Sequence, residues 1–148
     1  MNIYHYMGAG LDNVYLKNGY REFTYGEDVA ISIEDVTGLH RAIAASLIEK
    51  QELLNGKEIR FLRKELDLSQ RTLGLLLAVT DQSIAKWEKD EHAIQGSANV
   101  VLRLLVAERF LNRKGEVSEF IKMLASIDRK ETAELYFTET EEGWREAA

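Results

Sequence analysis

The clearest pattern of apolar and polar positions runs from residue 68 to residue 90 and predicts two short helices joined by a tight turn. Ser69 and Thr80 each stand directly before an apolar-periodic run, where a side-chain oxygen can cap the unpaired amides of a first helical turn. The apolar positions that can meet in one small core are Leu73, Leu76, Leu77, Val79, Ile84 and Trp87. We expect Leu75, which this core does not need, to be exposed and available to a second subunit or a partner.

Apolar spacings of three and four residues predict further helices on both sides of this segment. One begins after Asp35 or Thr37 and ends near Glu49, and a linker over residues 50–56 closes with Asn55-Gly56. The others cover Lys57 to Leu66, Ser97 to about Leu111, and Val117 to Ile127. We expect four side chains of the helix that follows Ser97 to close the core: Val101, Leu104, Leu105 and Phe110.

Residues 1–34 predict β structure instead. Val14–Lys17 and Tyr20–Phe23 flank Asn18-Gly19, the preferred pair for a two-residue type I′ hairpin turn. Residues 3–6 and 29–33 can add two more strands, and so small a sheet has to bury one face on a helix to be stable. The chain is therefore predicted to be α+β.

The C-terminal tail after Asp128 is rich in Glu and carries two apolar islands, at residues 135–137 and at Trp144. These are too few for a core of their own. They either dock on the body of the protein, which we favour, or serve as a short interaction segment.

The charge of the chain changes sign along its length. The 148 residues carry a net charge of −6, which by itself argues against binding to nucleic acid, because contacts to phosphates need Lys and Arg. Residues 1–55 have four basic and eight acidic side chains, residues 56–114 have eleven and eight, and residues 115–148 have four and nine. The basic surplus thus lies in residues 56–114, which contain the predicted two-helix segment. The acidic flanks are either solvated surface or docking faces for a basic protein.

Several classes of protein are disfavoured by what the sequence lacks. There are no cysteines, and the three histidines, His5, His40 and His92, are too far apart for a metal-ligand motif. No phosphate-binding glycine loop, nucleophile elbow or His-carboxylate grouping is visible, so we expect neither an enzyme nor a cofactor. The chain also has no long apolar run and no signal peptide, and we expect a cytoplasmic protein that does not enter a membrane.

The segment from Ser69 to Lys89 resembles the helix-turn-helix of Cro/XRE-type DNA-binding domains. The similarity rests on Ser69-Gln70 opening the first helix, Val79-Thr80 in the turn, and Trp87-Glu88-Lys89 ending the second, and it covers roughly residues 56–111. The family usually has glycine where this chain has Ala78, so the turn is either strained or differently built. The resemblance implies a five-helix DNA-binding domain over residues 56–114, between an α+β unit at residues 1–55 and a C-terminal helix with an acidic tail at residues 115–148.

In that family the second helix enters the major groove, and its exposed N-terminal residues read the bases. The Gln82 amide matches the donor and acceptor pattern of adenine, and Lys86 can donate to guanine or to a phosphate. Ser83 offers a small contact between them. Asp81 is either a charge that suits the helix N-terminus or an acceptor for the cytosine amino group.

Phosphate contacts are expected at the start of the first helix, from Gln70, from Arg71 and from the amides that follow Ser69, together with Lys89. Taken alone, Lys86 and Lys89 would read as a solvated helix face. The full set of predicted DNA-binding residues is Ser69, Gln70, Arg71, Asp81, Gln82, Ser83, Lys86 and Lys89.

The N-terminal sequence Gly10–Leu16 followed by Asn18-Gly19-Tyr20 is similar to a unit that precedes a Cro-type domain in proteins like the MqsA and HigA antitoxins. Related units can hold zinc through cysteines, which are lacking here in the turn Met7–Gly10. The two resemblances together imply a dimeric repressor that binds a palindromic operator in double-stranded DNA and neutralises a basic toxin protein. The alternative is a stand-alone regulator whose N-terminal unit senses a small molecule or another protein.

Overall fold

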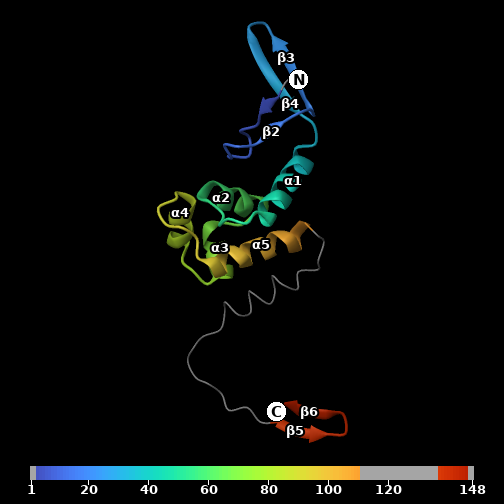
Figure 1. The fold of residues 1–148 in the computed structure, drawn as a ribbon, viewed down its shortest axis with the longest axis vertical. Helices are drawn as coiled ribbons and strands as arrows, with labels where there is room; N and C mark the ends of the chain where they lie inside the picture. The colour runs from blue at the N-terminus through green and yellow to red at the C-terminus, as the bar shows by residue number, and fades with distance from the viewer. Residues whose placement is uncertain (1–2, 111–136, 147–148) are drawn as a thin grey trace.

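The computed structural model describes residues 3–110 and 137–146, and these form an α+β protein, as predicted (Figure 1). Three antiparallel strand pairs accompany five helices within the described ranges. The elements are β1 (Tyr4–His5), β2 (Tyr15–Leu16), β3 (Tyr20–Tyr25), β4 (Asp28–Ile33), α1 (Val36–Glu49), α2 (Gly56–Glu65), α3 (Gln70–Leu77), α4 (Asp81–Glu88), α5 (Gly96–Phe110), β5 (Phe137–Thr140) and β6 (Gly143–Glu146). The helix predicted from Val117 to Ile127 lies outside the described residues.

The strands pair differently from the prediction. The hairpin expected across Asn18-Gly19 is wrong, because β2 pairs with β1 and β3 pairs with β4. The Gly19 carbonyl accepts a bond from the Glu34 amide at 2.8 Å, which extends the β3–β4 ladder and leaves no β2–β3 ladder. The real two-residue turn is Gly26-Glu27, where Gly26 has a φ of +60° that a glycine adopts without steric cost.

The β3–β4 hairpin projects away from the helices (Figure 1). Every residue from 21 to 30 is exposed, so the expectation that this sheet buries a face on a helix is wrong. Only its base joins the core, through Ile33. A two-stranded hairpin buries too little apolar surface to be stabilised by packing. The backbone hydrogen bonds between β3 and β4 are therefore its main stabilising interactions.

Helix α1 forms as predicted, and Asp35 is its N-cap. The Asp35 carboxylate accepts a hydrogen bond from the Gly38 amide at 3.0 Å, and the helix ends at Glu49. Ile43 and Ala44 are its buried residues, and they belong to the same core cluster as the residues of α2–α5. The fully buried centre of that core is Ile59, Leu62, Leu73, Ile84, Leu102 and Val106. Packing is thus continuous across residue 55, where the sequence suggested a boundary.

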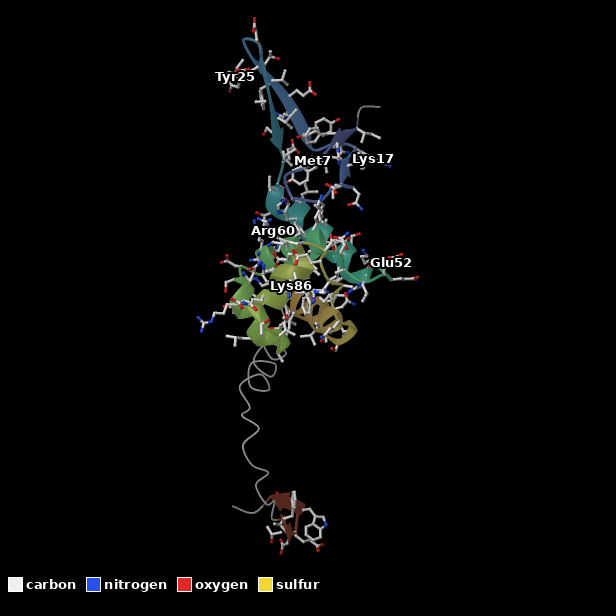
Figure 2. The ribbon with its side chains drawn as sticks, turned by 90° about the vertical axis from the view of Figure 1, so that its left-hand side faces the viewer. Met7, Lys17, Tyr25, Glu52, Arg60 and Lys86 are labelled. Atoms are coloured by element: carbon white, nitrogen blue, oxygen red, sulfur yellow. The ribbon has the colours of Figure 1, made fainter. Side chains whose placement is uncertain are left out.

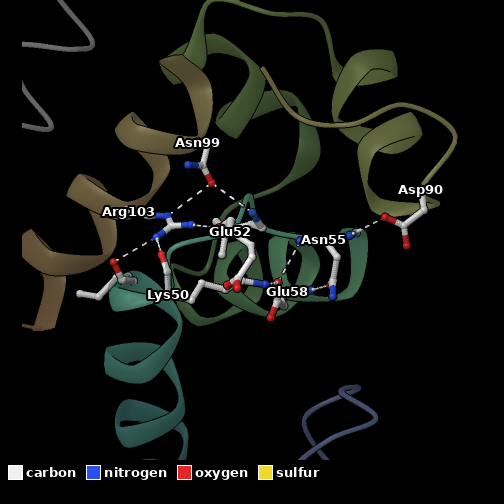
Figure 3. A network of polar contacts seen from close by, with 10 residues as sticks. Lys50, Glu52, Asn55, Glu58, Asp90, Asn99 and Arg103 are labelled. Atoms are coloured by element: carbon white, nitrogen blue, oxygen red, sulfur yellow. Dashed lines mark hydrogen bonds and ion pairs between the residues drawn. The ribbon is translucent and has the colours of Figure 1, made fainter. Parts of the chain in front are cut away.

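A polar network fastens the linker between α1 and α2 to α5 (Figure 3). The Arg103 guanidinium donates to the backbone carbonyls of Ile48, Lys50 and Glu52. The Asn99 side-chain oxygen accepts from the Leu54 amide at 3.2 Å. Satisfied carbonyls and amides cost little to bury, so this linker is held in one path.

Asn55 then opens α2 with a capping box. Its side chain accepts from the Glu58 amide at 2.9 Å, while the Glu58 carboxylate accepts from the Asn55 amide at 2.9 Å. The Gly56 amide donates to the Asp90 carboxylate at 2.8 Å, which ties the start of α2 to the end of α4. A Cβ at Gly56 would lie 2.5 Å from the Glu88 carbonyl oxygen, so only glycine permits this approach.

Two predictions about apolar residues need correction. Of the four side chains expected to close the core, Leu105 is buried and Val101 and Phe110 pack half-buried against it, whereas Leu104 is 48% exposed. The other buried apolar residues of α5 are Ala98, Leu102 and Val106. The predicted set mixed two faces, because Leu102 and Val106 lie four residues apart, whereas Leu104 points to the opposite side of the helix. In the C-terminal hairpin, Phe137 and Trp144 are 57% and 70% exposed, so the expected docking of these two side chains on the body is also wrong.

Candidate nucleic-acid interface

Helices α3 and α4 are the two short helices predicted across a tight turn, and both predicted caps are present. The Ser69 hydroxyl accepts from the Thr72 amide at 3.0 Å, and the Thr80 hydroxyl accepts from the Ser83 amide at 3.1 Å. Each cap satisfies one unpaired amide at the start of its helix. Leu73 and Leu76 of α3 and Ile84 and Trp87 of α4 are buried between the helices, as predicted.

Only Ala78, Val79 and Thr80 separate α3 from α4. Ala78 has φ +58° and ψ +39°, so of the two possibilities raised by the sequence the turn is the strained one. The Val79 amide donates to the Gly74 carbonyl at 2.9 Å and the Ala78 amide to the Leu75 carbonyl at 3.4 Å, which is a Schellman motif. A Cβ at Gly74 would lie 2.7 Å from the Val79 carbonyl oxygen, so this glycine allows the turn to fold back on α3.

The outer face of α4 carries the residues predicted to read bases. Asp81, Gln82, Lys86 and Lys89 are exposed. The Asp81 carboxylate accepts from the Gln82 backbone amide at 2.9 Å, which fits a charge placed at the helix N-terminus. The Ser83 hydroxyl lies 3.1 Å from the Thr80 hydroxyl and so belongs to the cap. Within the described ranges, the side chains of Gln82, Lys86 and Lys89 have no hydrogen-bond or ion-pair partner.

At the start of α3 the predicted phosphate-binding residues differ in whether their side-chain donors already have a partner in the protein. Arg71 is exposed and its guanidinium has no partner among the described residues. Gln70 donates from its side-chain amide to the Glu88 carboxylate at 3.2 Å, so one of its two N–H groups is occupied. Among the described residues, the Arg71, Gln82, Lys86 and Lys89 side chains are therefore without partners on this surface, and Gln70 keeps one N–H group unoccupied.

Glu88 links three helices. Its carboxylate is bound in a two-pronged ion pair by Arg63 of α2, with 2.6 Å from Nε to Oε2 and 3.0 Å from Nη2 to Oε1, and it also accepts from Gln70 of α3. The Glu88 and Arg63 side chains are only 6% and 13% exposed. Removal of one partner would leave a largely buried charge, so this pair fixes how α4 is presented. No local signal in the sequence predicts this pair, since 25 residues separate Arg63 from Glu88.

Leu75 is 60% exposed on α3, as expected. The apolar side chain lies on the solvent side of the helix, while its neighbours Leu73 and Leu76 enter the core.

The statement that the chain has no His-carboxylate grouping is corrected by the fold. His40 Nδ1 of α1 lies 2.8 Å from the Glu65 carboxylate, within hydrogen-bond distance. The Tyr6 hydroxyl lies 2.7 Å from His40 Nε2. Burial of Tyr6, followed by the nearby Glu65 and Tyr4, raises the pKa of its phenol above 10.0. The three residues come from elements up to 59 positions apart, so no local spacing could have revealed them.

Among residues 3–110 and 137–146, no group of three or more His, Asp or Glu side chains could hold a metal ion. In the same ranges no helix has both the length and the apolar character needed to cross a bilayer. Comparisons with protein-family models, with curated proteins and with solved structures found no match.

Proposed function

We propose that this chain is a sequence-specific DNA-binding repressor that acts as a dimer. The observation that carries the proposal is the outer face of α4, where Gln82, Lys86 and Lys89 present free donors beside a capped helix N-terminus. The Arg63–Glu88 pair holds this helix against α2, so the donors sit on a rigid element. The residues 56–114 that contain it carry the basic surplus of an otherwise acidic chain.

The roles of the residues follow from their chemistry. Gln82 reads a base edge, with adenine the best match to its amide, and Lys86 contacts guanine or a phosphate. Arg71 and Lys89 neutralise backbone phosphates and set the register. Two copies of α4, about 34 Å apart in a dimer, would contact successive major-groove half-sites of a palindromic operator.

A DNA-binding titration at several salt concentrations tests this function. The fragments should include the region upstream of the protein's own gene and a random duplex of equal length. We expect Gln82→Ala to relax base preference, whereas Lys89→Ala should weaken all sequences alike and lower the salt slope by about one. Equal affinity of all fragments for the wild-type protein at low salt would refute the proposal.

A further role as an antitoxin is favoured by a separate observation. The exposed β3–β4 hairpin carries Glu27 and Asp28 at its tip and Glu22 along β3, and residues 1–55 have a net charge of −4. An acidic projection of this kind suits a basic protein partner, whose approach it would accelerate.

The antitoxin role is tested with the product of the neighbouring gene, if that gene encodes a small basic protein. Co-expression should relieve its toxicity, and Glu22→Gln with Glu27→Gln and Asp28→Asn should weaken the complex, most at low salt. Toxicity that persists with the wild-type chain present would exclude this role and leave the DNA-binding proposal unaffected.

A further inference from the structure

A pocket of about 540 Å³ lies between the Met7–Gly10 loop and helix α2. Met7 lines the pocket from the loop and Arg60 lines it from α2. Figure 2 shows both residues near the junction of the strands with the helices. The volume falls in the range of ordinary small-molecule sites. None of the residues predicted to bind DNA lines this pocket.

Three cations line the α2 side of the pocket. Lys57, Arg60 and Lys64 recur at three- and four-residue spacings, so they share one helix face. Lys57 is paired with Asp12 at 2.6 Å in an exposed ion pair. Arg60 and Lys64 are exposed and have no hydrogen-bond or ion-pair partner within the described part of the chain.

The carboxylates of the pocket are already engaged. Glu65 is bound by His40, and Glu88 is bound by Arg63 and Gln70. Both nitrogens of His40 are used as well, one by Glu65 and the other by Tyr6, so this residue fixes the wall and leaves ligand contacts to others. The pocket is therefore left with uncompensated positive charge from Arg60 and Lys64.

The opposite wall is formed by the loop residues Met7–Gly10. Among the described residues, the amides of Gly8 and Ala9 have no acceptor, and adjacent free amides favour anions. Met7 and Phe61 add apolar surface next to the cations. A Cβ at Gly8 would lie 2.7 Å from the Tyr6 hydroxyl oxygen, so this glycine lets the loop close over the Tyr6 side chain.

We propose that this pocket binds a small organic anion, in which Arg60 and Lys64 hold a phosphate or carboxylate group and an apolar or aromatic body lies against Met7, Ala9 and Phe61. The ligand class follows from free cations and apolar surface within one pocket. It does not depend on the DNA-binding proposal. It would give the N-terminal loop a direct role in sensing a metabolite.

The test is a calorimetric titration of the full chain with phenyl phosphate, benzoate, benzyl alcohol and inorganic phosphate. Comparing phenyl phosphate with benzoate shows whether the site prefers a phosphate or a carboxylate. Benzyl alcohol tests the aromatic ring without a charge, and inorganic phosphate tests the anionic group without a ring. We expect one or both aromatic anions to bind at least tenfold more tightly than benzyl alcohol and inorganic phosphate.

Two variants and a matched control locate the site. Arg60→Gln with Lys64→Gln should weaken binding of the aromatic anion at least tenfold, because both charges that hold the oxyanion are removed. Ala9→Leu should weaken the aromatic anion by filling the pocket, while it leaves both cations in place. Arg71→Gln with Lys89→Gln removes the same charge elsewhere and should change ligand affinity less than twofold.

Three results would overturn the proposal. The first is that neither aromatic anion binds more tightly than inorganic phosphate at millimolar concentration. The second is that the control double variant loses as much ligand affinity as the pocket double variant. The third is that the pocket double variant loses DNA affinity uniformly and wild-type protein binds no small anion, in which case Arg60 and Lys64 contact the DNA backbone instead.

Discussion

The substitution Ala78→Gly should stabilise the protein, although it adds a glycine between two helices. Ala78 has a φ of +58°, a left-handed conformation that costs a non-glycine residue roughly 1–2 kcal/mol. Glycine removes this cost but gains freedom in the unfolded chain worth about 0.4–1 kcal/mol. The difference predicts a net gain in the free energy of unfolding of about 0.5–1 kcal/mol.

The neighbouring helix ends show why Ala78 is the position to choose. Asp67 after α2 and Asp90 after α4 also have positive φ and close the same Schellman pattern of backbone bonds. Aspartate tolerates this conformation better than alanine because its side chain can bond locally, and Asp90 also accepts from the Gly56 amide. Ala78 has no compensating bond from its side chain, so glycine should give the larger gain there.

Urea unfolding followed by tryptophan fluorescence measures the effect. Trp144 should first be replaced by Phe, since it is exposed, so that the signal comes from the buried Trp87 of α4. With a slope of about 2 kcal/mol per molar urea, the midpoint of Ala78→Gly should rise by about 0.25–0.5 M.

Ala45→Gly is the matched control, because Ala45 is exposed in the interior of α1 and has ordinary helical geometry. There the same substitution should lower stability by about 1 kcal/mol. A fall in the midpoint for Ala78→Gly comparable with that of the control would refute the assignment of strain to this turn.

Three further predictions concern polar contacts. Arg103→Met should lower the free energy of unfolding by about 2 kcal/mol, measured by urea unfolding, because the carbonyls of Ile48 at the end of α1 and of Lys50 and Glu52 in the linker lose their shared donor. Unchanged stability would contradict that role. Glu88→Gln should cost about 2 kcal/mol in the same assay and weaken DNA binding, since the Arg63 charge loses its buried partner, whereas a neutral effect would show that the pair is dispensable. Because the pKa of Tyr6 is raised in the folded state, the folded protein keeps the phenol proton to higher pH than the unfolded chain does. The stability that the protonated Tyr6 contributes is therefore complete below pH 10 and is lost as the pH rises further. Unfolding midpoints between pH 8 and 11 should therefore fall less steeply for Tyr6→Phe than for wild type, and identical slopes would contradict the shift.

The helical part of the fold was predictable because its signals are local. Asp35, Ser69 and Thr80 cap the helices that follow them, and the apolar spacings of α3 and α4 placed Leu73, Leu76, Ile84 and Trp87 correctly in the core. The exposed face of α4 followed from the same periodicity. Its chemistry toward DNA stays a prediction.

The strands and the polar contacts depended on information that is not local. Asn18-Gly19 is a strong hairpin signal, yet the Gly19 carbonyl bonds to Glu34 and extends the pairing of β3 with β4. Strand register of this kind depends on residues that are far apart in the sequence. Leu104 was misplaced because α5 is apolar on more than one side. The Arg63–Glu88 and His40–Glu65 pairs each join residues 25 positions apart, so they emerge only after the helices pack.

The exposed hairpin also makes this protein convenient to engineer. Because residues 21–30 contribute nothing to the buried core, the Gly26-Glu27 turn can carry an inserted epitope, fluorophore site or small folded domain without disturbing the helices. Such an insertion would leave α4 and the α2 pocket intact. A label in this turn would report binding of a partner protein to the hairpin separately from binding at α4 or in the α2 pocket.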